Sequence, residues 1–168
     1  MDDQAHYELS EKERNVALRV LSARLMSCAE LRAKLMTKGL SDARAELAVI
    51  WARERRYVDD AEVAAALVRR ALREGRGGRW LEAQGRKRLL SDALIREAQG
   101  ALASDDEPQV ARATALLERR FPDLDPTGRA LRRRAENFLL RRGYDFDIIR
   151  RAFERQRRAG ASPIGGQG

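Results

Sequence analysis

The chain has too few cysteine and histidine residues for several common kinds of functional site. Its 168 residues include one cysteine, Cys28, and one histidine, His6. A single cysteine cannot build a disulfide framework or a cysteine-based zinc site. A single histidine in a polar N-terminal arm supplies neither a pair of histidine metal ligands nor the base of a Ser-His-Asp triad. We therefore expect no metal, and no catalysis of these kinds.

Phosphate-binding loops and long apolar runs are also lacking. The sequence has no G-x-x-x-x-G-K-[ST] loop, and its most glycine-rich turn, residues 75–78, follows a helical pattern rather than a strand. No apolar run approaches the roughly 20 residues that cross a bilayer. The acidic start, Met-Asp-Asp-Gln, differs from the basic start of a signal peptide. These absences predict a cytoplasmic protein without cofactor or membrane contact, which acts by binding rather than as an enzyme.

Proline and aromatic residues are scarce, and this favours helices over strands. The chain has four prolines and 5% aromatic residues, against 43% apolar and 36% charged residues. No segment shows the alternation of a strand. Ser10 with Glu13 and Ser27 with Glu30 match the capping box that opens a helix. Together with other caps and turn residues, they predict an all-α fold of nine helices. The predicted helices begin at or near residues 10, 27, 41, 59, 79, 91, 105, 125 and 145.

Apolar residues three and four positions apart indicate which helix faces are buried. In the first four helices the residues expected to point inward are Leu18, Leu21, Leu25, Leu31, Leu35, Leu47, Ile50, Trp51, Val63, Leu67, Val68 and Leu72. The aromatic rings of Trp51, Trp80, Phe138 and Phe153 have the same spacing, and we interpret them as core residues rather than base-stacking platforms. The glycine-rich end from Gly160 onward is expected to be disordered.

Three segments of the chain, residues 31–41, 81–91 and 135–145, follow one pattern. Each has an apolar helix face, two polar or basic residues, a turn residue, an apolar residue and a Ser or Asp helix cap. The pattern predicts three tandem three-helix repeats, each with a helix-turn-helix-like pair, in an elongated and curved array. The expected boundaries are an arm at 1–13, repeats at 14–58, 59–104 and 105–158, and a tail at 159–168.

Positive charge is concentrated in two blocks. The net charge is +8, and 30 of the 34 basic residues are arginines. Residues 69–88 carry a net charge of +6 and residues 129–168 one of +7, whereas residues 89–128 between them carry −4. Basic helices of this kind suit an anionic partner such as a phosphate backbone. Two alternatives are solvated helix faces and an arginine excess that reflects codon bias.

Four short motifs occur in order along the chain. They are Ala17-Leu18 through Ser27-x-x-Glu30-Leu31-x-x-Lys34-Leu35-x-x-Lys38-Gly39, then Arg56-Tyr57-Val58-Asp59-Asp60 with Val63-Ala64, then Gly75-x-Gly77 before a basic helix, and Phe138-Leu139-Leu140-x-Arg142-Gly143-Tyr144. Together they resemble the motifs of the RecX family of bacterial regulators of the RecA recombinase, and the resemblance extends over residues 15–155.

The resemblance implies a non-enzymatic, monomeric protein that occupies the groove of the RecA–DNA filament. It would restrain strand exchange, ATP hydrolysis and stimulated repressor cleavage, and so act in homologous recombination, DNA repair and the SOS response. Two residues of the middle repeat depart from the family pattern. Gly85 stands at a core leucine position and costs roughly 1 kcal/mol inside a helix, and Leu89 stands at a capping glycine position, where a left-handed turn is unfavourable. We therefore expect the middle turn to have a different shape.

The basic blocks and the repeats together select candidate residues. The expected face for RecA, and for weak binding to single- and double-stranded DNA, consists of Arg69, Arg70, Arg73, Arg79, Arg86, Lys87, Arg88, Arg132, Arg133, Arg141, Arg142 and Arg150. The expected structural residues are Leu31, Leu35, Gly39, Tyr57, Asp59, Gly75, Gly143 and Tyr144.

Two other functions stay open from the sequence alone. One is a helix-turn-helix transcriptional regulator that reads DNA with the helix after Asp145, which carries Arg150, Arg151, Arg155 and Gln156. The other is a scaffold that binds an acidic protein without DNA, because guanidinium groups also pair with carboxylates.

Overall fold

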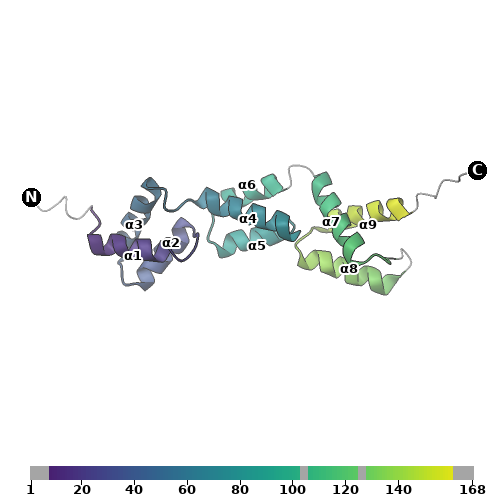
Figure 1. The fold of residues 1–168 in the computed structure, drawn as a ribbon, viewed down its shortest axis with the longest axis horizontal. Coiled ribbons are helices and arrows are strands. Elements are labelled where there is room, and N and C mark those ends of the chain that lie inside the picture. The colour runs from purple at the N-terminus through teal and green to yellow at the C-terminus, as the bar shows by residue number, and fades with distance from the viewer. Residues whose placement is uncertain (1–7, 103–105, 125–127, 161–168) are drawn as a thin grey trace, which may run out of the picture. The chain divides into compact units, whose positions relative to one another are not determined.

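A computed structural model describes residues 8–102, 106–124 and 128–160. Within these ranges all regular elements are α-helices, so the all-α prediction is confirmed (Figure 1). None of the described helices is long and apolar enough to cross a membrane. The helices are α1 (Glu11–Leu21), α2 (Cys28–Thr37), α3 (Asp42–Glu54), α4 (Asp60–Glu74), α5 (Gly78–Lys87), α6 (Asp92–Leu102), α7 (Asp106–Arg120), α8 (Arg129–Arg141) and α9 (Phe146–Gly160).

The predicted helix starts are confirmed where the structure describes them. Ser10 and Glu13 form a capping box at α1, and Ser27 and Glu30 form one at α2. The Asp59 carboxylate accepts the Ala61 N–H at 2.8 Å and so caps α4. The α8 helix begins after Gly128. The start expected at residues 125–126 and the disorder expected after residue 160 lie outside the described residues.

The chain divides into two compact units. Unit 1 comprises the described residues up to Leu67 together with Gln84–Ile95. Here α2 lies against both α1 and α3. Its core consists of Leu9, Ala17, Met26, Leu31, Leu35, Ala45, Ala48, Val49, Ala52 and Val58.

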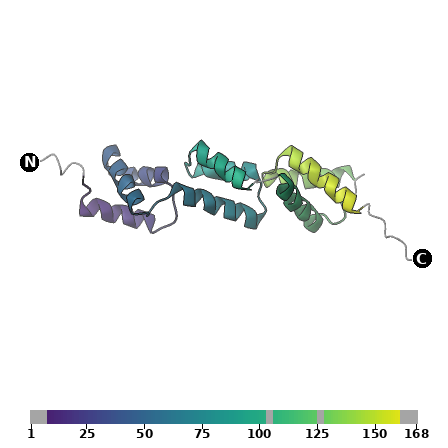
Figure 2. The same ribbon diagram turned by 90° about the horizontal axis from the view of Figure 1, so that it is seen from above.

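Unit 2 comprises Val68–Ala83 and the described residues from Arg96 onward. The α7 helix packs along α9, and both views show the two side by side (Figures 1 and 2). The core of this unit consists of Val110, Ala113, Leu116, Leu117, Ala135, Leu139, Tyr144, Ile148, Ile149 and Ala152.

Some of the expected inward faces are wrong. Leu18, Leu25, Ile50 and Leu72 are 41–46% exposed. The buried positions are instead taken by alanines such as Ala17, Ala48 and Ala71, all fully buried. Alanine allows helix backbones to approach closely, and this turns the larger neighbouring side chains outward. Leu25 is exposed for a second reason, because α1 already ends at Leu21.

The three helix-turn-helix turns have the same backbone hydrogen bonds. The N–H of Leu40, Leu90 or Tyr144 donates to a carbonyl five residues earlier, at 3.2, 3.1 and 3.2 Å. The N–H of Gly39, Leu89 or Gly143 donates to a carbonyl three residues earlier, at 3.0, 3.0 and 2.9 Å. This is the Schellman motif, in which a left-handed residue ends the helix.

The middle turn therefore does not have a different shape, and the sequence-based expectation is wrong. Leu89 adopts the left-handed conformation itself, with φ of +53°. Its side chain is 52% exposed, so the strain of that backbone is not accompanied by a steric clash in the core. Gly85 is equally well explained, because a Cβ there would lie 2.7 Å from Ile95 Cγ1.

Candidate basic interface

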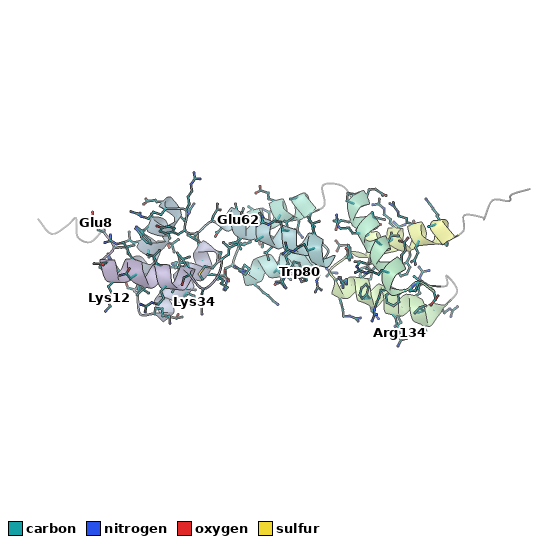
Figure 3. The ribbon with its side chains drawn as sticks, viewed as in Figure 1. Glu8, Lys12, Lys34, Glu62, Trp80 and Arg134 are labelled. Atoms are coloured by element: carbon teal, nitrogen blue, oxygen red, sulfur yellow. The ribbon has the colours of Figure 1, made fainter. Side chains whose placement is uncertain are left out.

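Around Trp80, unit 2 gathers arginines from α4 and from the turn that follows it. The guanidinium groups of Arg70 and Arg76 lie 5.4 and 5.6 Å from the Trp80 ring centroid. Both also pair with Glu74, at 2.7 and 3.3 Å. The Trp80 ring, labelled in Figure 3, thus binds cations of its own chain. The expected role in packing fits this geometry better than base stacking does.

The other predicted residues of this region lie on the helix surfaces. Arg69 and Arg73 are exposed one turn apart on α4. Arg79 is exposed near the start of α5, with its Nε 3.9 Å from an Asp145 oxygen. At the end of α5, Arg86 and Lys87 are exposed as well.

Arg88 is turned inward. Its Nε donates to the Glu30 carboxylate at 2.9 Å, and its Nη2 donates to the Leu25 carbonyl. The side chains of Arg88 and Glu30 are 25% and 10% exposed. Burial alone would raise the pKa of Glu30, but hydrogen bonds from Arg24, Ser27 and Arg88 outweigh it and leave that pKa lowered. Arg88 is therefore engaged within the protein.

The α8 helix presents most of the predicted arginines of the third repeat. Arg132, Arg133 and Arg141 are exposed, and the Arg132 guanidinium lies 5.2 Å from the Phe153 ring centroid. Arg150 on α9 pairs with Asp147 at 2.5 Å and with Glu154 at 3.2 Å.

Arg142, like Arg88, points into the protein. Its Nη1 donates to the carbonyls of Glu74 and Gly75, the second at 3.3 Å, and its guanidinium lies 4.7 Å from the Phe138 ring centroid. Burial, and then the neighbouring charge of Arg76, lower the pKa of Arg142.

Two exposed arginines on α8 were missed by the sequence reasoning. Arg134 lies seven residues before Arg141, and Arg129 lies four residues before Arg133. Both spacings return to nearly the same side of a helix. Figure 3 shows Arg134 projecting away from the ribbon. The helical period itself was the signal that would have found them.

The α9 helix carries the arginines that a DNA-reading helix would use. Arg155 and Arg151 both bind the Glu107 carboxylate on α7, Arg151 at 3.5 Å. Arg150 is held by two carboxylates of its own helix. The carboxylates partly neutralise this face.

The residues expected to be structural lie as follows. Leu31, Leu35 and Tyr144 are fully buried. Gly39, Gly75 and Gly143 have positive φ angles of 93°, 59° and 86° at helix ends. Tyr57 is half-exposed, with its ring edge-on to Trp51 at 5.6 Å.

The described residues offer little for catalysis. Burial and the Asp60 carboxylate raise the pKa of Cys28 to about 11, so the thiol is protonated at neutral pH. A protonated thiol is a poor nucleophile. Within the described ranges, no three His, Cys, Asp or Glu residues group closely enough to hold a metal ion.

The chain is similar in sequence to several regulatory proteins. The family model of the third three-helix domain of RecX matches residues 107–153. "Regulatory protein RecX" of Trichlorobacter lovleyi is 35% identical over 142 residues, which cover 83% of this chain and 92% of that protein. The protein of the same name from Stenotrophomonas maltophilia strain R551-3 is 37% identical over 137 residues, or 81% and 82% of the two chains.

Solved structures have the same fold. The crystal structure of RecX from Lactobacillus salivarius has a TM-score of 0.74 and 21% identity, and covers 87% of this chain and 95% of its own. A second crystal structure, of regulatory protein RecX, has a TM-score of 0.67 and 20% identity. The nine described helices, the thrice-repeated turn and the extended sequence identity agree, and the chain belongs to the RecX family of regulatory proteins.

Proposed function

We propose that the chain binds the RecA recombinase and its filament on DNA and inhibits the recombinase, ATPase and coprotease activities of RecA. It does so in the cytoplasm, as a monomer and without catalysis, and it binds free DNA weakly and with little sequence preference. Membership of the RecX family is the observation that carries this proposal. The exposed basic side chains supply the chemistry that an anionic filament requires.

The binding residues that we propose are those with exposed guanidinium or ammonium groups. On α8, Arg133, Arg134 and Arg141 are exposed, and none of them forms an ion pair with any described carboxylate. The same holds for Arg73 on α4 and for Lys87 on α5. An unpaired exposed cation can bind a phosphate or a carboxylate of a partner without first breaking an internal ion pair.

A sequence-specific transcriptional regulator is less well supported. Such a protein would read bases with α9, but Arg150, Arg151 and Arg155 on this helix are each paired with a carboxylate of the same chain. Each pair would have to break before its arginine could contact a base edge. A marked preference for one duplex sequence at physiological salt would favour this alternative.

The test compares two triple charge reversals. The first variant combines Arg133→Glu, Arg134→Glu and Arg141→Glu on α8. The control combines Lys12→Glu, Arg14→Glu and Arg19→Glu, which make the same change of net charge at exposed sites on α1. The readouts are RecA ATP hydrolysis on single-stranded DNA and strand exchange, with circular dichroism as the check of folding.

We expect the α8 variant to need about 100-fold more protein for half-inhibition, because the local potential changes sign. The control should stay within about threefold of the wild type, since it leaves that local potential unchanged. If the wild-type protein leaves ATP hydrolysis unchanged in excess and does not bind the filament, the proposed function is wrong. If the two variants lose inhibition equally, the function stands but α8 is not the binding surface.

A further inference from the structure

Arg88 and Arg142 occupy the same position in two successive repeats. Each directly precedes the left-handed residue of a helix-turn-helix turn, Leu89 or Gly143. Each reaches back to a carbonyl just before the second helix of the preceding repeat. Arg88 donates to the Leu25 carbonyl and Arg142 to the Gly75 carbonyl, and these two carbonyls are 50 residues apart, which is the offset between the aligned segments 31–41 and 81–91.

The backbone carbonyl at both sites accepts a hydrogen bond from the equivalent position of the preceding repeat, from a side chain at one site and from the backbone at the other. The Arg88 carbonyl accepts the Ser27 hydroxyl at 2.6 Å, and the Arg142 carbonyl accepts the Gly77 N–H at 2.9 Å. Ser27 and Gly77 are again 50 residues apart, each next to the start of its helix. We call the contacts of Arg88 with Leu25, Ser27 and Glu30 junction 1. Those of Arg142 and its neighbour Gly143 with residues 74–80 are junction 2.

Junction 2 is a close backbone-to-backbone contact. The Gly143 carbonyl accepts the Arg79 N–H at 3.1 Å. A Cβ on Gly77 would lie 2.3 Å from the Gly143 oxygen, and a Cβ on Gly143 would lie 2.4 Å from the Trp80 nitrogen. Contacts this close hold only if the turn is fixed in place, and the Arg142 side chain donates to two carbonyls beside it.

We propose that Arg88 and Arg142 are positioning residues that hold each turn against the preceding repeat, and that they do not contact the partner. The first repeat supports this assignment. Its equivalent residue, Lys38, is exposed, and its side chain has no partner among the described residues. Arginine is therefore present at both junctions, where a planar group with several fixed donors can bind two acceptors. An effect of Arg142 on inhibition rests on the proposed function. Junction 2 fixes the position of the adjacent, exposed Arg141, which is one of the proposed binding residues.

The test uses amide hydrogen exchange of the free protein, which needs neither RecA nor DNA. The amides measured are Gly77 and Arg79, the donors of junction 2. The variants are Arg142→Gln and Arg142→Lys, and the matched controls are Arg141→Gln and Arg141→Lys at the exposed neighbouring position. The Leu117 amide in the core of unit 2 reports global unfolding.

We expect exchange at Gly77 and Arg79 to be at least tenfold faster in both Arg142 variants and unchanged in both Arg141 variants, with Leu117 unaffected. Lysine keeps the charge, so its failure to restore protection would identify the guanidinium geometry as the cause. If Arg142→Gln unfolds the protein, Arg142→Lys decides the result. Unchanged exchange in Arg142→Lys would overturn the proposal.

RecA inhibition is then compared between Arg142→Lys and Arg19→Lys, the second at an exposed site on α1 outside the proposed binding surface. We expect a loss of at least tenfold in the first and of less than threefold in the second, although both keep the charge. Equal inhibition by the two would overturn the link from junction 2 to inhibition. A wild-type protein that fails to inhibit RecA would refute the proposed function and leave the exchange result standing.

Discussion

At the scale of single residues, the middle repeat has a small residue on α5 facing a large one on α6, the reverse of the first repeat. Gly85 on α5 faces Ile95 on α6, and a Cβ on Gly85 would meet the Ile95 side chain. In the first repeat the corresponding residues, 50 positions earlier, are Leu35 and Ala45, both fully buried. A large and a small side chain have changed places. The volume of the pair is roughly conserved, and cores tolerate such changes best.

This exchange predicts strong coupling between positions 85 and 95. Ile95→Ala should lower the free energy of unfolding by about 2–4 kcal/mol, because it leaves a cavity. Gly85→Leu should lower it by about 1–3 kcal/mol, because the added side chain overfills the site. The double variant reproduces the pair of the first repeat and should return to within about 1 kcal/mol of the wild type. Urea unfolding measures all four proteins, and simple additivity of the two losses would contradict the interpretation.

The left-handed backbone of Leu89 predicts that its substitution by glycine stabilises the fold. A left-handed backbone costs an L-residue about 1–2 kcal/mol, and glycine avoids most of that cost. Because the Leu89 side chain is 52% exposed, Leu89→Gly loses little burial. We expect the free energy of unfolding to rise by about 0.5–1 kcal/mol, as measured by urea or thermal unfolding.

The reciprocal change is the control. Gly39 has φ of +93°, and no neighbouring atom lies within 4 Å of the point that a Cβ would occupy, so Gly39→Leu tests the same backbone strain without a clash. It should lower the free energy of unfolding by about 1 kcal/mol. Opposite signs for the two changes support the argument, and equal signs refute it.

At the scale of elements, an ion pair connects the start of α1 to α3. The Glu13 carboxylate accepts from Arg44 Nε and Nη2 at 2.7 and 2.5 Å, and from the Ser10 N–H at 2.8 Å. The Arg44 hydrogen bond is the main cause that lowers the pKa of Glu13 from 4.5 to about 2. The Glu13 carboxylate thus completes the cap of α1 and also links α1 to α3.

The lowered pKa of Glu13 predicts how the free energy of unfolding depends on pH. A carboxyl group whose pKa is lower in the folded state stabilises the fold above its unfolded pKa and stops doing so as the pH falls through its folded pKa. The Glu13 contribution should therefore be complete above about pH 4.5 and should disappear as the pH falls towards 2. We expect it to amount to about 1–2 kcal/mol after allowance for partial exposure.

The measurement is urea unfolding of the wild type and of Glu13→Gln between pH 2 and 7. The difference in unfolding free energy should shrink as the pH is lowered through this window. A difference that is constant with pH would show that the variant acts only through packing.

The local elements were predictable from the sequence, and the contacts between them were not. Ser10, Ser27 and Asp59 cap helices through neighbours in the sequence, so their pattern is readable along the chain. The buried faces were less predictable, because alanines such as Ala48 set them through the approach of another helix. The inward directions of Arg88 and Arg142 depend on carbonyls more than 60 residues away, and charge alone made both look like surface cations.

At the scale of the whole molecule, positive charge and the junctions are distributed over both compact units. Junction 1 lies within unit 1 and junction 2 within unit 2. Basic residues with exposed side chains also occur in both, including Lys87 in unit 1 and Arg133 in unit 2. Both units therefore supply candidates for contacts with an anionic partner.

The charge predicts a steep dependence of DNA binding on salt. If four to six phosphates are contacted, the slope of log K against log salt on duplex DNA should be roughly −4 to −5. Binding should vary little among duplex sequences, and fluorescence anisotropy across a salt series measures both properties. A slope near zero would show that the basic blocks do not contact phosphates.

The close fit between Gly77 and Gly143 also constrains how such a protein can evolve. Repeat proteins stack similar units, each of which contacts only its neighbours, so a unit can be added only if its junctions fit. A second copy of the middle repeat would bring a leucine turn like that of Leu89 to the place where Gly143 now meets the Trp80 nitrogen, and a Cβ there would lie 2.4 Å away. Duplication of the middle repeat would therefore have to be accompanied by substitution at its turn. Because neither Gly77 nor Gly143 has room for a Cβ, this contact restricts which repeat can follow the middle one.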